Sequence, residues 1–195
     1  MKKVLSLLLA LVMCLSLCAC GGDASGGGIG GGTTTYKIYD TASTDAVEVK
    51  LKSVSYEDEY YIKGKSDAVP ANGYTFVVIE FSVKNIGKTD LDYFPLPSGN
   101  YTYIPGAIVC VDYNDGYTFW LDDVKGKNGV TYDENDLYTN YPTLNELKPL
   151  GETATYKVAI CVPDEVVDNT EAPLLIKFYL VKANGRSEVI TYTIR

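Results

Sequence analysis

Apolar and polar residues alternate along much of this chain with a period of two. Such alternation turns one row of side chains toward a core and the next toward solvent, which is typical of a half-buried β-strand. No segment keeps the i, i+3, i+4, i+7 apolar spacing of an amphipathic helix, although a short helical turn is expected over residues 164–167. The pattern predicts strands over residues 47–51, 77–83, 107–113, 117–121, 156–162, 174–181 and 188–194.

Turn-forming residues separate several of these predicted strands. Asn114-Asp115-Gly116 lies between two of them, and Asn184-Gly185 lies between the last two. Such sequences supply the positive φ angles of tight hairpins, so each predicts a β-hairpin. Residues 121–147 interrupt the even spacing because they are polar and acidic, and we expect a long inserted loop there. About seven to nine strands within one unit predict an all-β fold, an antiparallel β-sandwich.

The beginning of the chain has the layout of an export signal. Met1-Lys2-Lys3 is followed by an apolar run from Val4 to Leu17 and then by a glycine-rich stretch. A membrane-spanning helix needs about 20 predominantly apolar residues, and this run is shorter and has no stop-transfer cluster after it. A cleavable signal peptide is therefore favoured over a retained membrane span.

The residues Leu17-Cys18-Ala19-Cys20 resemble the lipobox of bacterial lipoproteins, with Cys18 where alanine or serine is more usual. The resemblance implies that signal peptidase II cuts between Ala19 and Cys20 and that Cys20 carries a diacylglycerol. Two acyl chains hold a protein stably at a bilayer, whereas one holds it only marginally. We therefore expect a protein whose membrane partner is the Cys20 lipid, anchored to the cell membrane and facing the extracellular side.

Composition divides the chain into three predicted parts. Residues 21–35 are dominated by glycine, which cannot bury a core and behaves as a flexible tether. The expected organisation is a signal peptide over residues 1–19, the lipidated cysteine and linker over residues 20–35, and one folded domain over residues 36–195.

Three segments along the folded part resemble those of one domain family. They are the strand and turn from Tyr74 to Gly87, the hairpin from Asp112 to Tyr117, and the stretch from Leu147 to Pro163. Together they resemble the telokin-like, immunoglobulin-like domain of unknown function found in lipoproteins of Gram-positive bacteria. The family usually has adjacent proline and glycine where Leu150 separates them here, so the turn is one residue longer. The resemblance implies an immunoglobulin-like sandwich and a surface location, but no substrate.

Charge and residue usage exclude several classes of function. The chain has 17 basic and 25 acidic residues, a formal net charge of −8, and cleavage would remove two of the basic ones. Such acidity disfavours a nucleic-acid partner. The chain has no histidine, which removes Ser-His-Asp and Cys-His nucleophilic systems. We expect no enzyme and no cofactor, with a carboxylate-dependent hydrolase as a remaining alternative.

Two acidic clusters are candidate calcium sites. Asp112, Asn114 and Asp115 form one cluster, and residues 133–136 form the other. Neither has the glycine at the sixth position and the glutamate at the twelfth position that an EF-hand loop requires. A hairpin turn and a solvated loop account for them, so no metal site is expected.

Aromatic residues are concentrated in the middle of the chain. Tyrosine and tryptophan present broad apolar rings with a polar group, which suits recognition of a glycan or a protein. They also pack across neighbouring strands, so a structural role is the alternative. If a ligand face exists, loops are where recognition residues concentrate. The candidates in or beside the predicted loop are Trp120, Tyr132, Tyr138 and Tyr141.

Two cysteines, Cys110 and Cys161, remain in the predicted folded domain. In each strand, the neighbours of the cysteine belong to the main apolar row, so the cysteine itself is expected to point away from the core. On neighbouring strands of one sheet, with Cα atoms within about 7 Å, they could form a disulfide. The alternative is a pair of unbridged thiols.

These observations favour a secreted, lipid-anchored surface protein whose domain binds an unknown protein or glycan without catalysis. An alternative is a structural or regulatory component of the cell envelope that acts through protein–protein contacts at sheet edges or loops.

Overall fold

The computed structural model describes residues 34–61, 67–91, 93–95, 101–121, 124–127, 131–132, 138–141 and 146–195. The chain divides into two compact units, Met1–Gly32 and Thr33–Arg195. All the described elements belong to the second unit, and the first of them begins at Thr35. The predicted signal peptide, its cleavage site after Ala19 and the lipid attachment residue Cys20 lie outside the described residues.

The first main sheet has five strands. Its order is β1-β15-β14-β8-β9, and every pair is antiparallel except the parallel pair of β1 with β15. The strands are β1 (Thr35–Tyr36), β15 (Ser187–Thr193), β14 (Leu174–Val181), β8 (Ala107–Tyr113) and β9 (Tyr117–Phe119).

The second main sheet also has five strands, in the order β12-β13-β5-β3-β2, and all its pairs are antiparallel. The register of β3 against β5 shifts between Leu51 and Ser53, which leaves Lys52 as a β-bulge. The strands are β12 (Tyr138–Tyr141), β13 (Thr153–Pro163), β5 (Tyr74–Asn85), β3 (Val47–Glu57) and β2 (Thr41–Ser43).

Shorter elements complete the described structure. A small sheet has the order β11-β10-β4, β6 pairs with β7, and α2 is a single helical turn at the predicted place. The prediction of a long loop over residues 121–147 is wrong. Three strands, β10, β11 and β12, form within this range by pairing with neighbouring strands. The short elements are β4 (Ala68–Val69), β6 (Tyr93–Pro95), β7 (Tyr101–Pro105), β10 (Val124–Gly126), β11 (Thr131–Tyr132) and α2 (Asp164–Asp168).

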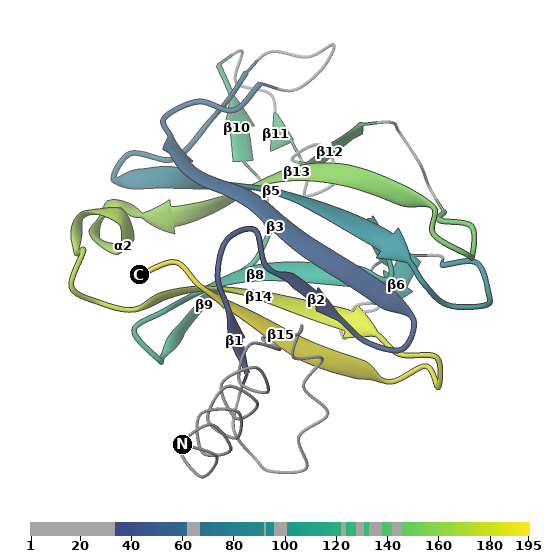
Figure 1. Cartoon of the computed structure of the whole chain (residues 1–195). Helices are drawn as coiled ribbons and strands as arrows, with labels where there is room; N and C mark the ends of the chain where they lie inside the picture. The colour runs from purple at the N-terminus through teal and green to yellow at the C-terminus, as the bar shows by residue number, and fades with distance from the viewer. Residues whose placement is uncertain are drawn as a thin grey trace, which may run out of the picture. The chain divides into compact units, whose positions relative to one another are not determined.

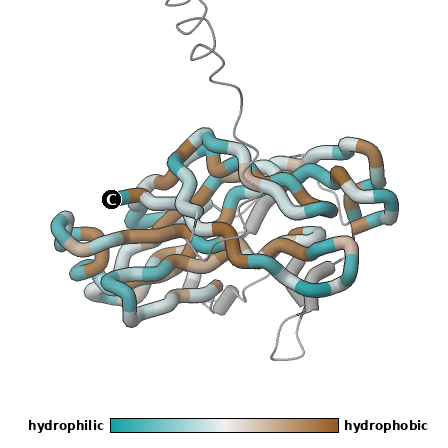
Figure 2. The backbone as a smooth tube through the Cα atoms, turned by 60° about the horizontal axis from the view of Figure 1, so that its bottom comes forward, coloured by the Kyte–Doolittle hydropathy of each residue, from teal (hydrophilic) through white to brown (hydrophobic). Residues whose placement is uncertain are grey.

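The two main sheets pack face to face around one core (Figure 1). The rings of Phe81 on β5 and Phe178 on β14 meet edge to face across the sheets, with centroids 4.9 Å apart. Phe178 also contacts the ring of Tyr192 on β15, at 5.6 Å. Figure 2 shows hydrophobic and hydrophilic positions alternating along the strands, as the sequence pattern requires. The predicted antiparallel β-sandwich is confirmed, with ten strands in its two main sheets.

Both predicted hairpins are present. Asn184-Gly185 joins β14 to β15, and Gly185 has a φ of 77°. In the hairpin between β8 and β9, the positive φ angles fall on Asn114 (50°) and Asp115 (51°) rather than on Gly116. Glycine adopts this left-handed conformation without a steric penalty, which accounts for the turn at Gly185. Asparagine and aspartate tolerate it better than most other side chains do, which accounts for the turn at Asn114 and Asp115.

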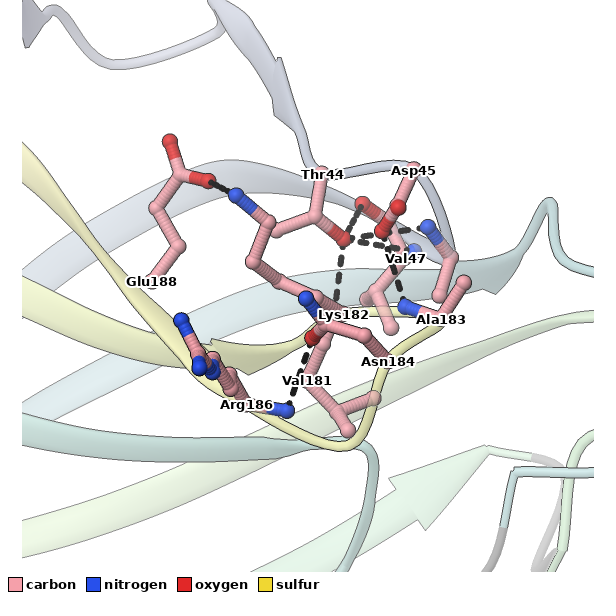
Figure 3. Close-up of polar contacts among 10 residues, drawn as sticks. Thr44, Asp45, Val47, Val181, Lys182, Ala183, Asn184, Arg186 and Glu188 are labelled. Atoms are coloured by element: carbon pink, nitrogen blue, oxygen red, sulfur yellow. Dashed lines mark hydrogen bonds and ion pairs between the residues drawn. The ribbon is translucent and has the colours of Figure 1, made fainter.

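One end of the sandwich is closed by side-chain hydrogen bonds between the sheets (Figure 3). In the turn between β2 and β3, Thr44 Oγ1 donates to the carbonyl oxygen of Val181 at 2.8 Å and accepts from the amide of Val47 at 3.0 Å. Asp45 Oδ1 accepts from the amide of Ala183 at 2.8 Å. A turn of the second sheet is thereby fixed to the β14–β15 hairpin of the first.

Candidate functional site

The outer face of the first sheet brings together charged, hydroxyl, thiol and aromatic side chains. In the register of this sheet, Cys110 on β8 lies opposite Lys177 on β14, and Asp112 lies opposite Thr118 on β9. Trp120 follows directly after β9. All of these residues alternate with the core row of their strands, so they share the side of the sheet that faces away from the sandwich interior.

An aromatic pair spans β8 near the β9 edge of this face. The rings of Trp120 and Tyr179 lie with centroids 5.6 Å apart and are tilted by 38°. Trp120 extends from β9 and Tyr179 stands on β14, and β8 lies between these strands. The two rings therefore meet across the outward side chains of β8. Trp120 remains 43% exposed, so a large part of its ring is available to a ligand.

An ion pair lies beside the aromatic pair. Lys177 Nζ donates a hydrogen bond to Asp112 Oδ2, and Thr118 Oγ1 donates to Asp112 Oδ1 at 2.6 Å. The hydrogen bond to Asp112 raises the pKa of Lys177 above its usual value. Both oxygens of the carboxylate are engaged, and the side chains keep 28% and 12% exposure for Lys177 and Asp112. The residues Asp112, Thr118, Trp120, Lys177 and Tyr179 are called the aromatic–ionic face below.

Cys110 lies on the same side of the sheet and is fully buried. Burial is the main cause that raises the pKa of its thiol to about 12, and the negative charge of Asp112 raises it further, while Lys177 acts in the opposite direction. A thiol reacts as the thiolate, so Cys110 is protonated and inert at neutral pH.

The disulfide alternative for Cys110 and Cys161 is wrong, and neither residue takes part in a disulfide. Cys110 lies on β8 of the first sheet and Cys161 on β13 of the second. Cys161 packs against a separate apolar cluster that contains Phe76 and Ala159, on the outer side of the second sheet. Alternation correctly predicted that both cysteines point away from the core. The outer faces of the two sheets lie on opposite sides of the sandwich, so the two thiols cannot meet.

The four aromatic residues predicted as a ligand face do not come from one sheet. Trp120 follows β9 of the first sheet, Tyr132 lies in β11 of the small sheet, and Tyr138 and Tyr141 are the ends of β12 in the second sheet. The side chains of these three tyrosines lie outside what the structure describes. The sequence prediction missed Tyr179 as the neighbour of Trp120, because that contact depends on β8 lying between β9 and β14.

In the described part of the chain, neither acidic cluster is joined by further side chains that could complete a metal site. Asp112 is engaged by Lys177 and Thr118, Asn114 and Asp115 form the hairpin turn, and residues 133–136 lie outside the described residues. Within the described ranges, no group of three acidic or cysteine side chains is placed to hold a metal ion. No helix of the described part is long and apolar enough to cross a membrane.

Comparison with known proteins gives only distant structural likenesses. No protein-family model matches the chain, and no curated protein matches its sequence. An uncharacterized β-sandwich protein from Clostridium difficile superposes with a TM-score of 0.49 and 18% identity, over 86% of this chain and 99% of that one. The yjhA protein from Bacillus subtilis gives 0.44 and 13%, over 82% and 99%. A candidate lipoprotein from the same organism, ycdA, gives 0.41 and 14%, over 77% and 37%. At these scores, neither an activity nor a location of this chain follows from the likenesses.

Proposed function

We propose that this protein is a lipid-anchored surface protein with a telokin-like, immunoglobulin-like domain that binds a ligand without catalysis. The aromatic–ionic face is the proposed binding site. The observation that carries the proposal is the half-exposed ring of Trp120, held against Tyr179 beside the Asp112–Lys177 ion pair.

The composition of this face suits recognition. An exposed aromatic ring offers a flat apolar surface for the carbon face of a sugar or for an apolar side chain. The neighbouring carboxylate, ammonium and hydroxyl groups offer hydrogen bonds that orient a ligand. Trp120 and Tyr179 restrain each other, so less conformational entropy is lost when a ligand binds.

The same residues give little support to catalysis. Cys110 is the nucleophilic side chain of this region, and it is buried with its pKa raised to about 12. Asp112 is tied to Lys177 and Thr118 rather than directed at a cleft. A binding role therefore agrees better with these contacts than a carboxylate-dependent hydrolase does.

The binding role is tested by capture of envelope proteins and glycans on the chain from residue 20, made with Cys20→Ser so that no lipid is attached. Trp120→Ala and Tyr179→Ala should each lower capture by about tenfold or more, as expected for a central aromatic contact. Tyr74→Ala is the matched control, because Tyr74 is 44% exposed but lies on β5 of the second sheet. Capture that both face variants leave unchanged would rule out this site.

The anchor is tested separately by metabolic labelling with an alkyne fatty acid. Wild-type protein and Cys18→Ser should be labelled and membrane-associated, because position 18 tolerates serine in the lipobox pattern. Cys20→Ser should lose the label and accumulate as precursor or be released. Normal labelling of Cys20→Ser would refute the anchor.

A further inference from the structure

The strand β3 has an edge that is only partly covered. β5 pairs with β3 along its whole length, from Val47 to Glu57. On the other side, β2 reaches only from Glu48 to Lys50, and the amide of Tyr39 donates to the carbonyl oxygen of Leu51 at 2.9 Å. Beyond the Lys52 bulge, no other strand that the structure describes pairs with this side of β3, and Figure 1 shows β2 lying along one end of β3 only.

The uncovered edge, residues Ser53–Glu57, begins directly after the β-bulge at Lys52. Proline and lysine commonly block such edges, and this segment contains neither. Ser53, Tyr56 and Glu57 are exposed. A shallow groove of about 550 Å³ opens beside the edge, lined in part by the apolar side chains Ile38, Val54 and Ile194. The edge is thus accessible and has an apolar flank.

The charges around this edge are self-complementary. Lys50 and Lys52 precede the edge, Glu57 is its last residue, and Asp58 follows it. When two identical strands with basic beginnings and acidic ends run antiparallel, each basic end meets the acidic end of the other strand. Opposite charges across a strand pair are favourable, and like charges are unfavourable.

We propose that the Ser53–Glu57 edge pairs with the same edge of a second copy of this chain, antiparallel and about a two-fold axis at Ser55. In this register, Ser55 faces the partner's Ser55, and Val54 faces the partner's Tyr56 next to the groove. Lys52, whose Nζ also donates to Thr155 Oγ1 of its own chain at 2.7 Å, meets the partner's Asp58. A two-fold interface contains each contact twice, so the charge contact is doubled. This edge belongs to the second sheet, so the proposal does not depend on the aromatic–ionic face.

The proposal is tested by sedimentation velocity on the chain from residue 20 with Cys20→Ser, over a wide range of concentrations. The wild-type chain should dimerise as concentration rises. Lys52→Glu and Asp58→Lys should each raise the dimer dissociation constant by about tenfold or more, because each change turns two opposite-charge contacts into two like-charge contacts. Unchanged far-UV circular dichroism would show that each variant is folded.

A mixture of the two variants gives the sharper test. In a heterodimer of Lys52→Glu with Asp58→Lys, both charge contacts are again between opposite charges, so an equimolar mixture should dimerise more tightly than either variant alone. Lys88→Glu makes the same charge change at an exposed position after β5 and should behave as wild type. A wild-type chain that stays monomeric, a mixture that stays monomeric, or an equal effect of Lys88→Glu would overturn the proposal.

Discussion

The side-chain amide of Asn85 donates a hydrogen bond to the carbonyl oxygen of Leu147 at 2.7 Å, across 62 positions of sequence. The same nitrogen donates to the carbonyl oxygen of Thr89 at 2.8 Å, and Asn85 Oδ1 accepts from the amide of Gly87 at 2.9 Å. Asn85 is fully buried at the end of β5. Its side chain therefore joins two of the segments on which the family resemblance rests, which makes their role structural.

Replacing Asn85 by alanine should lower the free energy of unfolding by about 2–3 kcal/mol, because it removes these hydrogen bonds and leaves buried polar groups unpaired. Urea denaturation followed by intrinsic fluorescence measures the change. Lys88→Ala, at an exposed position of the following turn, serves as control and should change stability by less than about 0.5 kcal/mol. A comparably small effect of Asn85→Ala would contradict this role.

Thr44 is expected to stabilise the contact between the two sheets. Thr44→Val keeps the shape of the side chain but loses the hydrogen bonds to Val181 and Val47, so it should cost about 1–2 kcal/mol of unfolding free energy. Thr44→Ser keeps the hydroxyl and should retain most of the stability. Thermal or urea unfolding of the three proteins measures the difference, and equal losses for valine and serine would assign the effect to packing instead.

Stability should fall in alkaline solution because of Cys110. Its pKa is about 12 in the folded protein against an ordinary value of 9.0, so above pH 9.0 the unfolded chain loses a proton that the folded chain retains. The contribution of this thiol is complete below pH 9.0 and is lost as the pH rises toward about 12. Cys110→Ala should show a shallower decline of unfolding free energy with pH. Parallel curves for the two proteins would argue against the raised pKa.

Alternation along the sequence was sufficient to predict the long strands. The row Val77, Ile79, Phe81 and Val83 is buried in the core, and the predicted turn at residues 164–167 lies within α2. These elements have one face on the core, so each sequence carries its own signal. Turn chemistry predicted both hairpins for the same reason, since φ preferences belong to the residues themselves.

Pairing between distant strands left no such signal. β12 is only four residues long, and it is a strand because it pairs with β13. Its own residues do not predict this pairing. All seven residues of β8 are buried, including those on the outer face of the sheet. Nothing in the sequence indicated that other side chains cover this face. The sequence also left open whether Cys110 and Cys161 lie in one sheet, because alternation gives the face of a strand but not the sheet that contains it. The meeting of Trp120 with Tyr179 also depends on strand order.

The parallel pairing of β1 with β15 has a mechanical consequence. Thr35 and Tyr36 pair with Thr191 and Tyr192, and Tyr36 packs against the ring of Tyr192 at 5.6 Å. A pulling force that enters the folded unit at its N-terminal end acts first on this two-residue contact. Because β14, β8 and the second sheet do not depend on β1 for their own pairing, β1 can detach under load while the sandwich stays folded. The junction would then lengthen and absorb tension before the core yields.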